Sequence, residues 1–541
     1  MRTQFLLIAL SVFLFVGGPA FAQGPCSSQS SKLACVIPQM YGLQPGEKIF
    51  DFGNVLYDAP GPNGHPAHFN PEFGSQLGPL TSAIGRQANL LPLASPSSGV
   101  LLSYDSSLKT FAVITDSSLG PILGERGETV GRHKLFIGFS SQFFNFDRID
   151  GVNLRSIPVV LPHRDDTFDN APFTCSINPA TGTDLNGCAF VRDAFYSQNS
   201  INLKINQYTG YITFGLSSHV DVSMVIPFES VRMSLYSQST IVLGSDGSFT
   251  PAPGSRDLQI LNQNVTGTNG APYFFHLFQD CPDTSPATGA AGLAPQCLHH
   301  SFPDPNFSGS GSSSVNSSSG IGDIVARVKW NAWSRERLKF ATGMDVRFPT
   351  GDALNFLGSG SYGVKPFVVL SYRARVSPHV MIGYEWNSHS ILSARINDVP
   401  NGSGPPSASI GLLTGNKGYM PSDFVYTAGV DAWFTKWLTG SFDVVGARIF
   451  RGGTEAVTTQ SFPAPCSAGC LAEPSPSTVS SPSLAPNNDA SYNVTNASMG
   501  VKIRPIPKVS KLVLTANVLV RLDNGGIHSK PAPLAGLGYT F

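Results

Sequence analysis

Apolar and polar residues alternate along many stretches of the chain after residue 130. Successive side chains of a β-strand point to opposite faces, so alternation at period two indicates a strand with one apolar and one polar face. Val220 and Val222 share one such face, while Asp221 and Ser223 share the other. The same pattern predicts about twelve strands. They cover residues 133–146, 200–215, 218–231, 323–333, 337–348, 363–375, 378–388, 423–433, 437–449, 491–504, 511–522 and 531–541.

Connections between the predicted strands alternate between long and short. A long loop joins the first two strands, the next two meet at Ser217, and the longest loop precedes the turn at residues 334–336. Long loops on one side and tight turns on the other are typical of outer-membrane barrels, whose turns lie in the periplasm. A soluble β-sandwich or jelly roll also alternates apolar and polar residues, but it does not predict this rhythm of loop lengths. We therefore predict an all-β fold, a transmembrane antiparallel up-and-down β-barrel with long extracellular loops, over residues 131–541.

The last predicted strand ends the chain on an aromatic residue. Leu537, Tyr539 and Phe541 share one face of it at period two. A bare apolar edge strand recruits other chains, whereas closure of a barrel pairs the final strand with the first. The ending resembles the carboxy-terminal signature of Gram-negative outer-membrane barrels. That resemblance implies that the barrel-assembly machinery recognises these three residues.

Residues 1–22 have the form of a secretory signal peptide. Arg2 precedes an apolar run over residues 5–16, and Ala20 and Ala22 supply the small residues of a cleavage site. The run is too short for a spanning helix. We expect cleavage after Ala22, export, and a place in the lipid of the bacterial outer membrane. Residues 23–130 are rich in Pro and Gly and do not follow the strand rhythm, so they form a periplasmic extension, a plug in the lumen or extra strands.

Composition narrows the possible partners. Charged residues make up 13% of the chain and the formal net charge is zero, which argues against nucleic acid as a partner. The eight cysteines form four pairs that are local in sequence, and in an exported chain such pairs indicate disulfides in loops. These are Cys26 and Cys35, Cys175 and Cys188, Cys281 and Cys297, and Cys466 and Cys470. Their spacing and surroundings do not predict a metal site.

Charged residues on the polar face of the predicted strands are the best candidates for function. In a membrane barrel their apolar neighbours face lipid, so the charges line the lumen. They form either a structural ladder of ion pairs or a selectivity lining for a solute. Arg327 is expected to lie near Asp345, across the turn at residues 334–336. The candidates are Arg327, Lys329, Lys339, Asp345, Arg347, Lys365, Arg373, Glu385, Asp431, Asp443 and Arg521.

Motifs of catalysis or cofactor binding are not recognisable in the sequence. Residues 358–363 spell GxGxxG, but a strand follows in place of the helix that a dinucleotide site requires. The chain has no Walker A, HExxH or GxSxG motif. We therefore expect neither a cofactor nor an enzyme.

Several turns and strand edges resemble outer-membrane proteins grouped as the MetA pathway of phenol degradation and, more distantly, FadL-type channels. The matching pieces are residues 120–126, 143–147, 320–323, 347–352 and 357–361. The resemblance implies an outer-membrane channel or transporter for small hydrophobic or aromatic solutes. The alternative is a structural or adhesion protein that acts through long, disulfide-stapled surface loops.

Overall fold

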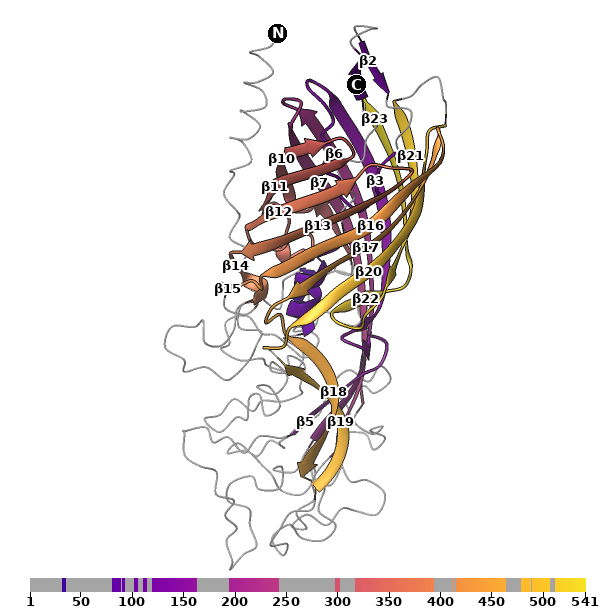
Figure 1. The fold of residues 1–541 in the computed structure, drawn as a ribbon. Helices are drawn as coiled ribbons and strands as arrows, with labels where there is room; N and C mark the ends of the chain where they lie inside the picture. The colour runs from indigo at the N-terminus through magenta and orange to yellow at the C-terminus, as the bar shows by residue number, and fades with distance from the viewer. Residues whose placement is uncertain are drawn as a thin grey trace, which may run out of the picture.

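Twelve strands form a closed antiparallel β-barrel in the computed structural model of the chain (Figure 1). Each strand pairs with the next, and β23 pairs with β3 to close the ring. The strands are β3 (Leu135–Ile149), β6 (Ala194–Gly215), β7 (Val220–Val242), β10 (Ile324–Arg335), β11 (Leu338–Phe348), β12 (Gly363–Tyr372), β13 (Val376–Asn387), β16 (Asp423–Thr435), β17 (Leu438–Ile449), β20 (Tyr492–Ile503), β21 (Leu512–Arg521) and β23 (Ala532–Thr540). The predicted fold and number of strands are confirmed.

The structure describes the barrel strands and shorter parts of the chain before and between them. The described residues are 32–35, 80–88, 90–92, 102–105, 110–113, 119–162, 194–242, 297–301, 317–393, 412, 415–463, 478–487, 489–505 and 511–541. The predicted signal peptide, its cleavage site and most of the long loops lie outside these residues. Cys35 is disulfide-bonded. The predicted cysteine pairings involve residues outside the described part and stay predictions.

Short turns gather at one end of the barrel and long connections at the other, which we call the turn end and the loop end. The turns span residues 216–219, 336–337, 373–375, 436–437 and 504–511, and Phe541 lies at the same end (Figure 1). The loop end carries further strands that were not predicted. These are β4 (Val152–Asn153), β5 (Ile157–Pro162), β8 (Cys297–Ser301), β9 (Ser317–Ile321), β14 (His389–Ser390), β15 (Gly418–Tyr419), β18 (Thr454–Pro463), β19 (Thr478–Asn487) and β22 (Ile527–Ser529).

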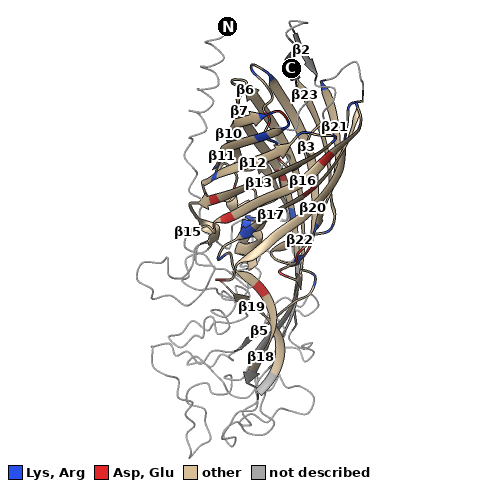
Figure 2. Ribbon diagram, in the orientation of Figure 1, with Lys and Arg blue, Asp and Glu red and all other residues tan. Residues whose placement is uncertain are grey.

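Apolar side chains cover the outer face of the barrel. On β10, Val328 and Trp330 are 46% and 51% exposed, while Lys329 and Asn331 between them are buried. Charged residues of both signs lie along the barrel strands (Figure 2). An apolar exterior around a polar interior is the arrangement of a transmembrane barrel. Among the described residues, no helix is both long enough and apolar enough to cross a membrane.

The last strand has the face that its alternation predicts. Leu537 and Phe541 are 48% and 52% exposed, and the ring of Tyr539 packs 4.7 Å from that of Phe541. The backbone N–H of Phe541 donates to the carbonyl of Leu135 at 2.7 Å, which joins the chain end to the start of β3. Pairing with β3 and β21 leaves no open edge on β23.

Parts of the amino-terminal region are also described. The 3-10 helix η1 spans Leu33–Cys35, residues 80–88 form an α-helix, and β1 (Leu102–Asp105) pairs with β2 (Thr110–Val113) in a hairpin. Gly85 of the α-helix packs against Leu392 and Phe356 at the loop end, and Arg86 donates to the carbonyl of Gly452 at 2.6 Å. The α-helix therefore lies against the loop end of the barrel (Figure 1).

Candidate solute-binding cavity in the barrel lumen

Residues 119–130 cross the inside of the barrel before the chain enters β3. The N–H of Leu119 donates to Thr439 Oγ1 on β17 at 2.9 Å, and the N–H of Val130 donates to Asp221 Oδ2 on β7 at 3.0 Å. Between these contacts, the N–H of Gly127 donates to Ser371 Oγ on β12 at 3.1 Å. Because β17, β12 and β7 lie on different arcs of the ring, the segment spans the lumen. We call residues 119–130 the crossing segment.

Two glycines allow the crossing segment to approach the barrel wall. A Cβ atom added to Gly124 would lie 2.3 Å from His379 Nε2, and one on Gly127 would lie 2.9 Å from the Cβ of Lys339. Contacts this short exclude a side chain unless the wall moves. Lys502 and Asn331 donate to the carbonyls of Pro121 and Gly127. The backbone of the segment is thus held by side chains that point inward from several strands.

Glu125 and Arg126 make the crossing segment part of an ion-pair network. Glu125 accepts from Arg327 Nη1 at 2.5 Å and from Lys329 Nζ at 2.9 Å, and Arg126 pairs with Asp431. All of these side chains are buried or nearly so. Charges removed from water require such partners, and loss of one partner leaves the other uncompensated. The network therefore joins the segment to β10 and β16.

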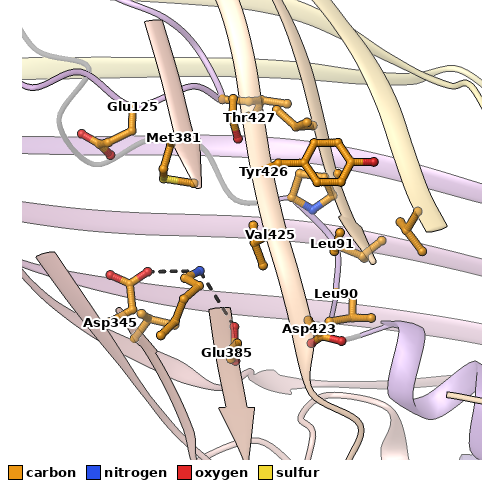
Figure 3. Close-up of a pocket in the computed structure, with 18 of the residues that line it drawn as sticks. Leu90, Leu91, Glu125, Asp345, Met381, Glu385, Asp423, Val425, Tyr426 and Thr427 are labelled. Atoms are coloured by element: carbon orange, nitrogen blue, oxygen red, sulfur yellow. Dashed lines mark ion pairs between the residues drawn. The ribbon is translucent and has the colours of Figure 1, made fainter. Parts of the chain in front are cut away.

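The network continues along the wall toward the loop end. Arg327 Nε lies 2.6 Å from Asp345 Oδ1, and Lys365 Nζ lies 3.1 Å from Asp345 Oδ2 and 3.9 Å from Glu385 Oε2 (Figure 3). Arg347 then contacts Glu385 at 3.0 Å and Asp323 at 3.4 Å. Arg327, Arg347 and Lys365 therefore each have acidic partners. This arrangement is a ladder of ion pairs along the inner face of β10 to β13.

His379 lies between two aspartates nearer the turn end. Its Nε2 atom is 2.7 Å from Asp443 Oδ1, and its Nδ1 atom is 3.4 Å from Asp431 Oδ1. Because Asp431 also pairs with Arg126, this cluster touches the crossing segment from β13, β16 and β17. Its side chains are at most 7% exposed. The cluster fixes the segment on the arc opposite Arg327 and Lys329.

A cavity of 210 Å³ lies in the lumen beside the crossing segment. Leu123 and Glu125 form one part of its lining, and Leu90, Leu91 and Pro92 form another (Figure 3). The barrel wall supplies both apolar and charged side chains. The apolar ones are Val225, Val325, Met381, Val425, Val445, Ala447 and Val494. The charged ones are Arg327, Asp345, Arg347, Lys365, Glu385 and Asp423, and they share β10, β13 and β16 with apolar residues.

A smaller cavity of 20 Å³ adjoins the first and shares Leu90, Leu91 and Pro92 with it. Gln87, Phe144 and Ile527 extend its lining toward β3 and β22. Residues 90–92 therefore separate two spaces within the lumen.

The predicted lumen residues occupy different places in this site. Eight of them belong to the ion-pair network and the His379 cluster: Arg327, Lys329, Asp345, Arg347, Lys365, Glu385, Asp431 and Asp443. Arg521 contacts Asp523 at 2.8 Å beside the smaller cavity. Lys339 donates to Ser334 near the turn end, and Arg373 lies in the turn between β12 and β13.

Glu125, Arg126, His379 and Asp423 were not among the predicted residues. Glu125 and Arg126 precede the alternating strands, so periodicity cannot predict whether their side chains point inward or outward. Their signal was the resemblance at residues 120–126. His379 and Asp423 lie at the ends of predicted strands, where alternation is hardest to read. Among the described residues, no group of His, Cys, Asp and Glu is arranged to hold a metal ion.

A separate pair of carboxyl groups lies beyond the barrel strands at the loop end. Asp150 accepts from the N–H groups of Glu455 at 2.9 Å and Gly526 at 2.5 Å. Glu455, on β18, is 3% exposed. Burial raises the pKa of Glu455 well above its usual value, and Asp150 raises it further, while Arg86 lowers it. The paired strands β18 and β19, which we call the outer hairpin, therefore favour the protonated form of Glu455.

We expect the outer hairpin to be more stable in acid than at neutral pH. A carboxyl group with a raised pKa in the folded state stabilises that state below its ordinary pKa and loses this contribution as the pH rises. Protection against limited proteolysis should therefore fall between about pH 4 and about pH 8. The measurement is the cleavage rate of β18 and β19 in purified protein at the two pH values.

Glu455→Gln should flatten this pH dependence, because it removes the titrating group. Asp489→Asn is the matched control, since the side chain of Asp489 is 68% exposed near the same hairpin. An unchanged pH dependence in Glu455→Gln would show that another group is responsible.

Comparisons with known proteins match one family and several solved structures. The family described as "Putative MetA-pathway of phenol degradation" matches residues 254–396, which confirms the resemblance over that segment. No curated protein sequence matches the chain. An outer membrane channel from Pseudomonas putida F1 is 8% identical, with 77% of this chain and 99% of that chain covered and a TM-score of 0.35.

Two further solved structures are similar to the chain at a lower level. A mutant of the TodX monoaromatic hydrocarbon channel is 10% identical, with 81% and 99% of the two chains covered and a TM-score of 0.24. A FadL homologue from Pseudomonas aeruginosa is 9% identical, with coverage of 76% and 89% and a TM-score of 0.22. The chain thus resembles a family of outer-membrane proteins over residues 254–396, and its fold is a membrane-spanning β-barrel.

Proposed function

We propose that the protein is an outer-membrane channel for small, largely apolar molecules the size of one aromatic ring. The observation that carries this proposal is the 210 Å³ cavity inside a closed barrel, lined in part by apolar side chains. A dry apolar cavity of about 150 Å³ holds benzene. Twelve strands lie between the eight that side chains fill and the sixteen or more that leave an aqueous pore. Such a barrel suits a narrow path for one small molecule.

We further propose that the crossing segment acts as a plug. Residues 119–130 bridge opposite arcs of the wall, so a solute that leaves the cavity toward the turn end must displace them. The domain organisation is then a signal peptide over residues 1–22, an amino-terminal region over residues 23–130 that contributes the plug, and the barrel over residues 131–541. Transport on this route includes no catalytic step.

Solute uptake by intact bacteria tests the channel proposal. The outer leaflet of the outer membrane resists apolar solutes, so cells that produce the protein should take up radiolabelled toluene or benzyl alcohol several-fold faster than cells without it. Planar bilayers with purified protein provide a second readout, in which the closed lumen predicts a low conductance. Equal uptake by cells with and without the protein would refute the proposal.

We also propose that the terminal aromatic face supports assembly in the outer membrane. Phe541→Ala removes an exposed ring from a closing strand whose other outward residues are Leu537 and Tyr539. We expect several-fold less heat-modifiable barrel in the outer membrane, with export across the inner membrane unchanged. Phe450→Ala is the control, because Phe450 is 36% exposed and lies in a loop-end connection rather than on the terminal strand. Normal assembly of Phe541→Ala would count against this role.

A further inference from the structure

The cavity contains one carboxyl oxygen that its surroundings leave unsatisfied. Asp423 begins β16, lines the cavity and is 2% exposed. Its Oδ1 atom has no hydrogen-bond partner among the described residues. The side chain of Asn387 hydrogen-bonds to the carboxyl group, and its amide Nδ2 also donates to the carbonyl of Pro421 at 2.6 Å, so Oδ1 is the one oxygen left without a partner. A buried acceptor without a donor carries a desolvation cost, and a ligand that supplies the donor removes that cost.

The basic side chains near Asp423 form ion pairs with other acidic residues. Lys365 contacts Asp345 and Glu385, and Arg347 contacts Glu385 and Asp323. Both act on Asp423 electrostatically without an ion pair within 4.0 Å in the described part of the chain. The lining holds four acidic residues (Glu125, Asp345, Glu385 and Asp423) and three basic ones (Arg327, Arg347 and Lys365). An anionic ligand would therefore be disfavoured, because acidic residues outnumber basic ones in the lining and the basic residues already have acidic partners.

Apolar groups lie close to Asp423 in the same cavity. Leu90, Leu91, Val425 and Met381 line the same cavity as Asp423 (Figure 3). A ring packed against these side chains would place one substituent toward Asp423. The cavity thus offers an apolar surface together with one unsatisfied carboxyl oxygen at its loop-end side.

We infer that the cavity selects ring-sized apolar ligands that carry one hydrogen-bond donor, and that Asp423 is the residue that determines this specificity. The inference rests on the proposed channel function and adds the chemistry of the solute. A hydroxyl or a protonated amine donates to Asp423 Oδ1 while the ring buries its surface against Leu90, Leu91 and Val425. A plain hydrocarbon leaves the carboxyl oxygen unsatisfied, and a carboxylate is repelled by it.

Four ligands with the same ring separate these cases: toluene, benzyl alcohol, benzylamine and benzoate. Binding is measured by calorimetry on the purified full-length protein in detergent micelles. We expect benzyl alcohol and benzylamine to bind roughly threefold to tenfold more tightly than toluene, the range for an ordinary hydrogen bond. Benzoate should bind most weakly. Equal affinity for toluene and benzyl alcohol in the wild type would overturn the inference without any variant.

Substitution of Asp423 then tests the residue itself. Asp423→Ala should bring benzyl alcohol and toluene to equal affinity, and comparison in the same micelles cancels partition of the ligands into detergent. Asp423→Asn keeps a carbonyl oxygen, so it should retain the preference for benzyl alcohol over toluene. Heat-modifiable mobility confirms that both variants are folded. A preference for benzyl alcohol that persists in Asp423→Ala would overturn the assignment.

Two outcomes distinguish this inference from the proposed function. If toluene binds and enters cells but the four ligands show no order, the channel stands and the specificity fails. If none of the four ligands binds or enters, both are wrong.

Discussion

Replacing both Glu125 and Arg126 with alanine should raise the conductance of the barrel on the order of tenfold, because twelve strands without a filled interior leave an open path. The double substitution removes one partner each of Arg327, Lys329 and Asp431 in one step. Buried charges that lose a partner favour water, and water enters the lumen only if the crossing segment moves away. The measurement is single-channel recording of wild type and variant in planar bilayers.

Glu128→Ala is the matched control for this release. Glu128 lies in the same segment, is only partly buried and accepts a hydrogen bond from Ser371 at 3.2 Å. Its loss should leave the conductance close to that of the wild type. A double variant that conducts no better than Glu128→Ala would mean that residues 119–130 do not close the lumen.

Asp345→Ala should destabilise the barrel by about 3–5 kcal/mol, the usual cost of breaking a buried ion pair by removal of one partner. Asp345 is 3% exposed and contacts both Arg327 and Lys365, so its removal leaves two cations short of a partner. The free energy of unfolding can be measured by denaturant titration in detergent micelles or in liposomes. The Asp345→Ala variant should keep the wild-type fold and unfold at a lower denaturant concentration than the wild type.

Met344→Ala provides the control on the opposite face of the same strand. Met344 is 46% exposed and points to the outside of the barrel. Met344→Ala should lower the free energy of unfolding by well under half as much as Asp345→Ala. The side chain of Met344 faces lipid or detergent and not packed protein, so its removal leaves no unpaired charge in the barrel. Equal losses for the two variants would show that the ion-pair ladder contributes nothing specific to stability.

The strands of the barrel could be predicted because lipid imposes a strict alternation. Each strand must present apolar side chains outward and tolerates charges inward, so Val328 and Trp330 identify one face and Lys329 the other. Beyond the lipid this constraint ends. The outer parts of β6 and β7, over residues 194–199 and 232–242, were not predicted to be strands, and there Met233 and Leu235 are buried instead of facing outward.

The charged residues of the cavity lining could be predicted in part, because they lie on the inward face of alternating strands. Arg327 and Asp345 alternate with apolar neighbours, and their pairing follows from the antiparallel register across the turn at residues 336–337. Glu125 and Arg126 could not be placed in this way. Their segment has no strand periodicity, and its position in the lumen depends on contacts with residues 91 to 377 positions later in the chain. Such long-range packing leaves no local trace in a sequence.

A disulfide that fixes the crossing segment to the wall gives the most direct test of the channel with a movable plug. The double variant Gly127→Cys with Lys339→Cys suits this purpose. A Cβ atom added to Gly127 would lie 2.9 Å from the Cβ of Lys339. A small shift brings the two Cβ atoms to the separation of roughly 3.5–4.5 Å that is typical of a disulfide. Cells that produce the double-cysteine protein are compared with cells that produce either single-cysteine variant. The measured quantity is the uptake rate of radiolabelled benzyl alcohol. Uptake should fall to the level of cells without the protein only in the double variant, and uptake that is equal in all three would contradict the proposed route.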